Sequence, residues 1–186
     1  VQEDKRHYSR GKATRLLTPS PERVVARCPH YGECGGCQQQ HVSEALQQQS
    51  KKQALERMLN HNSPQPLKVE QVIHGDSWHY RRRARLSLRW DNKQQRLDMG
   101  FRKNGSSEIV NIRQCPVMVQ SLDRLLPELR QCLTELQGAR DLGHAELVQA
   151  DNGVMLVLRH LKPFSVADHE KLERFSQHHQ LMLFLA

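Results

Sequence analysis

Alternating apolar and charged positions mark a strand near the middle of the chain. In residues 81–90, one side of the alternation holds Arg81, Arg83, Arg85 and Arg89. The other side holds Ala84, Leu86, Leu88 and Trp90. Successive side chains of a strand point to opposite faces of a sheet, so this segment predicts a half-buried strand. Further strands are expected at 94–101 and 107–112, with DNK and KNGS as hairpin turns.

Apolar residues at helical spacing predict two of the helices. The apolar row of segment 119–137 is Leu122, Leu125, Leu126, Leu129, Cys132, Leu133 and Leu136. Pro127 either kinks this helix or marks its true first turn. Cys132 falls on the apolar face, which indicates a core thiol. Segment 43–60 predicts a second helix, capped by Ser43, whose thin apolar stripe would pack at a surface or against another domain.

The remaining pattern completes an α+β fold. Short strands are expected at 67–73, 145–150, 153–160 and 181–186, and the capped segment 165–179 predicts a helix between the last two. Strands followed by helices in this order indicate an antiparallel sheet with helices on one side.

Composition indicates a polyanionic partner. The 186 residues carry a formal net charge of +8, with a pI of about 9.5. Basic proteins of this kind most often bind nucleic acid. No apolar run approaches the roughly 20 residues that cross a membrane, so no membrane association and a cytoplasmic location are expected. The chain begins at Val1 and ends in the strand-like run LMLFLA, which reads as a piece of something longer.

Four cysteines form the strongest candidate site. Cys28, Cys34 and Cys37 follow the spacing C-x5-C-x2-C, and Cys115 lies in a second Cys-Pro step far along the chain. Three clustered thiols and a distant one are typical of a tetrahedral metal centre or an iron–sulfur cluster. A fifth cysteine and the absence of a signal peptide favour a reducing compartment over disulfides. Spacing alone leaves zinc and an iron–sulfur cubane as close rivals.

The basic strand is the candidate nucleic-acid surface. Four arginines at alternate positions between Arg81 and Arg89 would span about 26 Å, at roughly 3.3 Å per residue. Their planar guanidinium groups suit RNA phosphates, and Trp78, His79 and Tyr80 could stack on an unpaired base. A solvated sheet face is the simpler alternative, but the register of the arginines and the adjacent rings favour RNA. His30, inside the cysteine loop, is expected to form a hydrogen bond and not to bind metal.

The segments RCPHYGECGGCQQQH, YRRRARLSLRW and MGFRKNGSSEIVNIRQCP resemble the bacterial 23S ribosomal RNA (uracil-5-)-methyltransferases, relatives of the tRNA uracil-5-methyltransferases. The resemblance implies a [4Fe–4S] cluster on Cys28, Cys34, Cys37 and Cys115. It divides the chain into the tail of a TRAM-type β-barrel (1–20), a linker with the cysteine loop (21–41), a helix packing on a catalytic domain (42–61), and a central RNA-recognition domain (62–186). The expected RNA contacts are Tyr80, Arg81, Arg82, Arg83, Arg85, Arg89, Arg102 and Lys103.

The same resemblance defines what this chain lacks. The family methylates uracil with a Rossmann-like domain that binds S-adenosylmethionine and carries a cysteine nucleophile and a glutamate base, and none of its motifs occurs here. No catalytic or S-adenosylmethionine-binding residue is therefore assigned, and the chain alone is expected to be an inactive monomer that binds 23S rRNA and not DNA. Two alternatives remain: a stand-alone zinc-stabilised RNA-binding module, and an electron-transfer protein whose basic strand is incidental.

Overall fold

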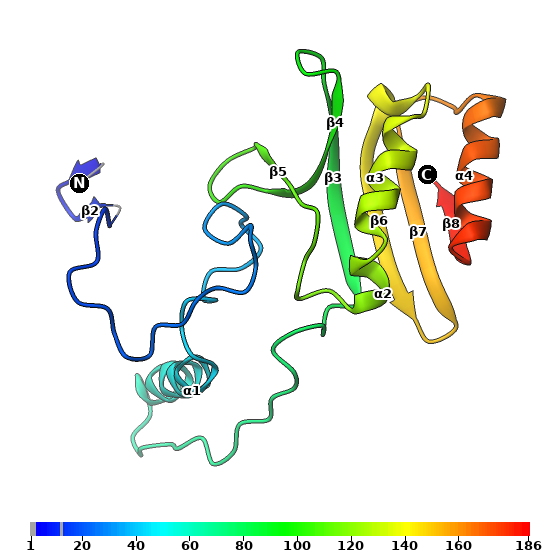
Figure 1. Ribbon diagram of the computed structural model, residues 1–186. Coiled ribbons are helices and arrows are strands. Elements are labelled where there is room, and N and C mark those ends of the chain that lie inside the picture. Colours follow the sequence, from blue (N-terminus) through cyan, green and yellow to red (C-terminus); the bar gives the residue numbers. More distant parts are fainter. Residues whose placement is uncertain (1–2, 12) are drawn as a thin grey trace.

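The computed structural model describes residues 3–11 and 13–186, and a six-stranded sheet forms its body (Figure 1). The strands are β3 (Arg83–Asp91), β4 (Arg96–Arg102), β5 (Ile109–Asn111), β6 (Leu142–Ala150), β7 (Gly153–His160) and β8 (Leu181–Leu185). Their order is β5-β4-β3-β6-β7-β8, and every neighbouring pair is antiparallel except β7 and β8. The fold is thus α+β as expected, but the prediction of a wholly antiparallel sheet is wrong at the edge formed by β7 and β8. The chain crosses over through a helix before β8, and such a crossover brings the next strand in parallel.

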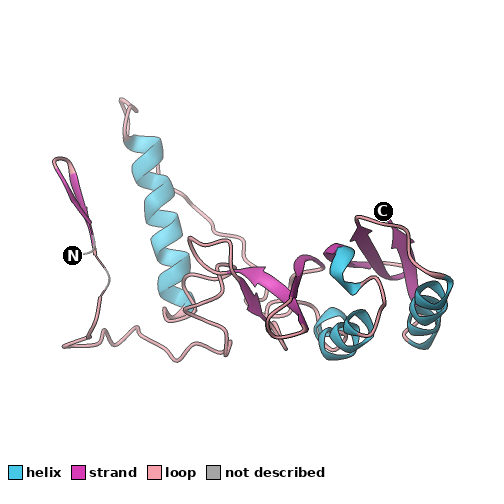
Figure 2. Ribbon diagram, turned by 90° about the horizontal axis from the view of Figure 1, so that it is seen from above, coloured by secondary structure: helices cyan, strands magenta, loops and turns pink. Residues whose placement is uncertain are grey.

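Helices cover one face of the sheet (Figure 2). They are α2 (Gln120–Asp123), α3 (Leu126–Thr134), the 3-10 helix η1 (Ala139–Asp141) and α4 (Val166–His178). Leu126, Leu129 and Leu133 of α3 are fully buried against sheet residues such as Leu86 and Met99. Among the described residues no helix covers the opposite face, where arginines of β3 are exposed.

The predicted helix at 119–137 is two helices. The chain turns at Arg124 and Leu125, and Pro127 lies in the first turn of α3. Proline has no N–H to donate, and the first turn of a helix needs none. Of the two interpretations of Pro127, the structure therefore confirms that it marks a first turn.

The prediction of a strand at 67–73 is wrong. This segment has no regular secondary structure, and the side chains of Leu67 and Ile73 are 48% and 90% exposed. A strand is stabilised by hydrogen bonds to a neighbour and by burial of one face, and this segment obtains neither here.

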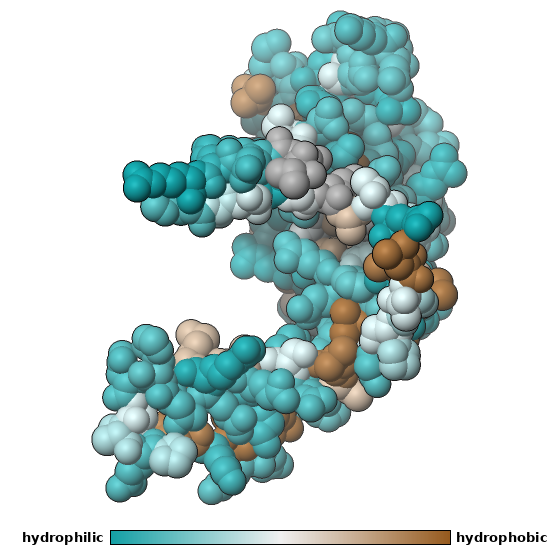
Figure 3. Space-filling view, turned by 90° about the vertical axis from the view of Figure 1, so that its left-hand side faces the viewer, coloured by the Kyte–Doolittle hydropathy of each residue, from teal (hydrophilic) through white to brown (hydrophobic). Residues whose placement is uncertain are grey.

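The N-terminal third projects from the sheet. It contains the short hairpin β1 (Glu3–Lys5) and β2 (Tyr8–Arg10), and the helix α1 (Glu44–Asn60). Ser43 caps α1 by accepting a hydrogen bond from the N–H of Leu46 at 3.3 Å, as expected. No residue of α1 is buried, and Met58 is 76% exposed. Seen from the side of these elements, the surface is mostly hydrophilic, with isolated apolar spots and a deep recess (Figure 3).

Candidate metal centre and nucleic-acid interface

The four predicted ligands line a single pocket. Cys28, Cys34, Cys37 and Cys115 meet there, together with Arg81 and other residues. All four are free thiols. The fold therefore brings together sulfur atoms from two segments that are far apart in the sequence.

Backbone hydrogen bonds fix the cysteine loop on the sheet. The N–H of Gly35 donates to the carbonyl of Arg102 at 2.9 Å, and the N–H of Asn104 donates to the carbonyl of Glu33 at 3.1 Å. These bonds hold the loop against the turn between β4 and β5. Within the loop, the N–H of Gly36 donates to the sulfur of Cys34 at 3.4 Å.

Cys115 approaches the same pocket from the other side. Its N–H donates to the carboxylate of Asp123 at 2.5 Å, which anchors it to α2. Burial raises the pKa of Cys115 to about 11, and it also raises the pKa of Cys28. A thiol must lose its proton before it can bind a metal ion. The N–H of Arg113 donates to Nε2 of His30 at 3.3 Å, so His30 does form a hydrogen bond, with a partner outside the cysteine loop.

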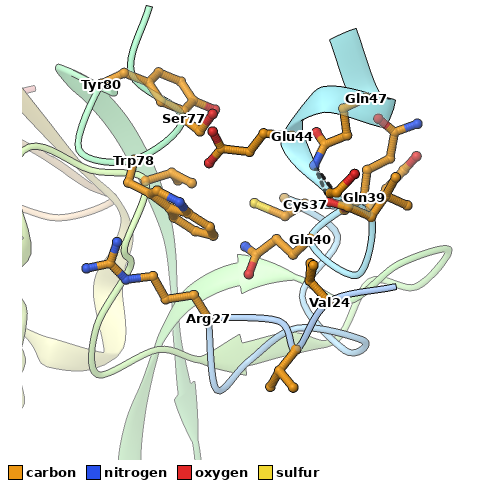
Figure 4. Close-up of a pocket in the computed structure, with 16 residues that line it drawn as sticks. Val24, Arg27, Cys37, Gln39, Gln40, Glu44, Gln47, Ser77, Trp78 and Tyr80 are labelled. Atoms are coloured by element: carbon orange, nitrogen blue, oxygen red, sulfur yellow. Dashed lines mark hydrogen bonds between the residues drawn. The ribbon is translucent and has the colours of Figure 1, made fainter. Parts of the chain in front are cut away.

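A second, larger cavity adjoins the cysteine loop (Figure 4). It has a volume of about 680 Å³, and Cys37 and Gln40 contribute to its wall. The guanidinium of Arg27 lies 5.2 Å from the centroid of the Trp78 ring, whereas Tyr80 is 52% exposed at the rim. The lining combines aromatic rings with amide and carboxylate groups, which is chemistry suited to a nucleobase.

The three predicted stacking rings differ in their availability. His79 is engaged, because its Nδ1 contacts the carbonyl of Met118 at 3.0 Å. Trp78 is half-buried and already stacked by Arg27, so Tyr80 presents the most accessible ring.

The alternation of β3 is confirmed. Arg83, Arg85 and Arg89 are exposed on the open face, and the apolar residues between them are buried. Arg81 lies before β3, is half-buried, and lines the cysteine pocket. It therefore belongs to the wall of the cysteine pocket more than to the open face.

Several of the predicted RNA-binding side chains have acidic partners. The ion pairs are Arg82 with Asp151 (2.6 Å), Arg83 with Glu146, Arg89 with Asp98 (3.5 Å), and Lys103 with Glu108 (3.8 Å). Two of the acids, Glu146 and Asp151, come from β6 and the turn after it. The sequence shows the arginines but not the strand that is paired with them, so this neutralisation was missed.

Positive charge remains concentrated around His144. The pKa of His144 is lowered from its usual 6.5, first by burial and then by Arg85, Arg159 and Arg102. Within the described part of the chain, these three arginines form none of the ion pairs with acids. Arg159 was not predicted, although its alternate position in GVMLVLRH signals a residue on one sheet face.

No helix in the described residues is long and apolar enough to cross a bilayer.

Comparison with known proteins identifies relatives of the chain. No protein-family profile matches the chain. Over 184 residues it is 60% identical to the 23S rRNA (uracil(1939)-C(5))-methyltransferase RlmD of Enterobacter sp. (strain 638), covering 99% of this chain. The chain is homologous to part of these 23S rRNA uracil-C5 methyltransferases. It spans 41% of that relative, and it is 53% identical to the RlmD of Cronobacter sakazakii (strain ATCC BAA-894), of which it spans 42%.

A solved structure shares the fold. The tRNA (uracil-54, C5)-methyltransferase of Pyrococcus abyssi, in complex with S-adenosyl-L-homocysteine, superposes with a TM-score of 0.62 at 22% identity. The match covers 84% of this chain and 37% of that enzyme. Both the methyltransferase homologues and this neighbour are longer than the chain.

Proposed function

We propose that this chain is the iron–sulfur-binding and RNA-contacting part of a 23S rRNA uracil-C5 methyltransferase that uses S-adenosylmethionine. The observation that carries the proposal is the meeting of Cys28, Cys34, Cys37 and Cys115 in one pocket. That pocket lies beside the strand whose arginines point to the open face. Homology to methyltransferases of 23S rRNA supports RNA as the partner.

The donor set favours an iron–sulfur cluster over a single zinc ion. No three of these sulfur atoms lie within 4.8 Å of one another. One zinc ion holds thiolates at about 2.3 Å, which places sulfurs about 3.8 Å apart. A wider arrangement of four thiols fits the larger [4Fe–4S] group. When bound, the cluster would supply metal–thiolate bonds that tie residues 28–37 to residue 115, and we assign it no part in methyl transfer.

The proposed RNA surface combines the three arginines around His144 with the cavity of Figure 4. Arg85, Arg102 and Arg159 would bind phosphates, while Tyr80 would stack on an unpaired base. The ion-paired Arg82, Arg83, Arg89 and Lys103 contribute less, because an RNA phosphate must compete with a carboxylate. We propose 23S rRNA as the partner of a monomer in the cytoplasm, with no role for DNA.

The methyl-transfer chemistry belongs to other parts of the parent protein. Four cysteines line the metal pocket, and Cys132 is half-buried and packed against the core, so none is placed to attack a uracil. We therefore assign S-adenosylmethionine to the parent enzyme and expect this chain alone to be inactive. The exposed helix at 42–61 would pack on the catalytic domain, and residues 1–20 would belong to a TRAM-type barrel.

Filter binding to a 23S rRNA fragment at several salt concentrations tests the RNA proposal. Each lost phosphate contact lowers the slope of log affinity against log salt by about 0.7 to 0.9. We expect Arg85→Gln and Arg102→Gln each to have this effect, and Lys162→Gln, whose ammonium pairs with Asp141 at 3.1 Å, to have none. An affinity that does not depend on salt, or equal slopes for all three variants, would contradict the proposal.

A further inference from the structure

A second group of metal-ligand side chains lies on the helix-covered side of the molecule. Glu128 is in the first turn of α3, His178 is the last residue of α4, and His179 is the C-cap of α4. One carboxylate oxygen and one nitrogen from each ring all lie within 4.8 Å of one another. These three residues are separate from the cysteine pocket and from the basic sheet face.

Neighbouring charges leave Glu128 available to a cation. The nearby Lys171 donates to the backbone carbonyl of Glu135 at 2.8 Å, and its ammonium lies 4.0 Å from the Glu135 carboxylate. Arg174 pairs with Glu170 at 3.8 Å. In the described residues, the ion-pair partner of Glu128 is the imidazole Nε2 of His179, at 3.2 Å.

The histidine pair is held in place by its surroundings. The ring of His179 is 14% exposed and packs against Phe175, with ring centroids 4.4 Å apart. His178 meets His179 edge to face at 4.8 Å. Because both lie at the C-terminus of α4, the partial negative charge of the helix end favours a cation there.

We propose that Glu128, His178 and His179 bind one divalent transition cation of the zinc class. Two imidazoles and a carboxylate are a donor set that zinc accepts with a fourth position left for water. Ligand atoms at about 2.0 to 2.1 Å from zinc lie about 3.3 Å apart. The present spread, within 4.8 Å, must therefore contract on binding, and two of the three side chains, those of Glu128 and His178, are exposed.

An ion pair between His179 and Glu128 explains their contact but leaves His178 without a role. The cation accounts for all three residues. It would also join α3 to α4, and so hold α4 and the adjoining strand β8 in place.

Titration with zinc sulfate, followed by nitrogen-15 NMR of the histidine rings, tests the site in the full chain purified anaerobically. This readout is specific to each residue, so zinc bound by the cysteines does not interfere. We expect ring signals of His178 and His179 to shift together. Affinity at this site should fall roughly tenfold or more in Glu128→Gln and in His178→Ala.

Glu173→Gln and His74→Ala are the matched controls, because both residues are exposed and lie outside the group. They should leave the titration unchanged. Unshifted rings of His178 and His179 at millimolar zinc would overturn the proposal. So would a Glu128→Gln variant that keeps its circular dichroism spectrum and binds zinc as tightly as the wild type.

Discussion

The pKa of His144 depends on the charges of the open sheet face. It lies on β6 opposite Arg159 of β7, and Arg85 and Arg102 add to the positive potential that, after burial, lowers its pKa. On the same strand, the carboxylate of Glu146 is held by Arg83. Because the folded pKa is below the usual 6.5, the unfolded chain binds more protons near that pH. His144 therefore removes stability as the pH falls through 6.5 and on to the folded value.

Replacing Arg159 by glutamine should raise the pKa of His144 toward 6.5, because a neighbouring positive charge is removed. A proton NMR titration measures this, with His144→Gln used to assign the signal. Lys162→Gln is the control and should leave the pKa of His144 unchanged. Binding of an RNA fragment should shift the pKa in the same upward direction. A pKa that does not respond to Arg159→Gln would contradict this description of the face.

For single residues, the sequence identifies the exposed charged side chains but not the side chains that contact them. The alternation from Arg83 to Arg89 correctly separates exposed from buried positions. It could not reveal that Glu146 lies opposite Arg85, within reach of Arg83, because the register of β3 and β6 depends on chain segments far apart. The same limit hid Arg159. The four cysteines were easier to identify, since their spacing alone signals a shared site.

At the scale of elements, the pair β4–β5 supports the cysteine loop. Gly100 of β4 lies opposite Asn111 of β5, and a Cβ at Gly100 would come within 2.0 Å of the carbonyl oxygen of Val110. Two residues along β4, the carbonyl of Arg102 holds the N–H of Gly35. Only glycine permits this close approach of the strands, so the position of the loop depends on Gly100.

We expect Gly100→Ala to force β4 and β5 apart, lower the free energy of unfolding by about 2 kcal/mol or more, and reduce metal content. Urea unfolding and metal analysis measure the two effects. Gly143→Ala is the matched control in β6, because its Cβ would meet the carbonyl oxygen of Arg159 at an ordinary 3.7 Å. Equal stability and metal content in the two variants would contradict a supporting role for this strand pair.

Elements were predicted well where local signals were strong. Ser43 and Ser165 both cap their helices as the sequence indicates. The segment 67–73 has the apolar residues of a strand but no neighbour to pair with, and a sequence window cannot show that absence. The parallel arrangement of β7 and β8 likewise follows from the path of α4 across the sheet.

At the scale of the molecule, the sheet with its helices differs from the N-terminal third. The core is contributed by β3 to β8 and the helices on them, whereas α1 buries no residue. On α1, the apolar residues Leu55, Met58 and Leu59 are 46%, 76% and 46% exposed. Such exposure is typical of a surface that another part of a protein covers, which agrees with the proposed packing of residues 42–61.

This difference predicts two unequal responses to loss of a helix cap. Ser165→Ala should lower the free energy of unfolding of the sheet by about 1 kcal/mol, because α4 is part of its core. Ser43→Ala should fray α1, seen as lower helical circular dichroism, and leave the sheet's urea midpoint unchanged. Equal shifts of that midpoint would show that α1 unfolds together with the sheet.

The central claim is that four cysteines from two distant segments hold an iron–sulfur cluster, and anaerobic measurement of iron, sulfide and zinc per chain tests it most directly. We predict about four irons and four sulfides, with absorbance near roughly 400 nm. The iron and sulfide content should persist in Cys132→Ser. It should be reduced or lost in Cys115→Ser, because Cys115 lines the pocket. One zinc ion per chain without iron or sulfide, or a Cys115→Ser variant with wild-type iron content, would contradict the account.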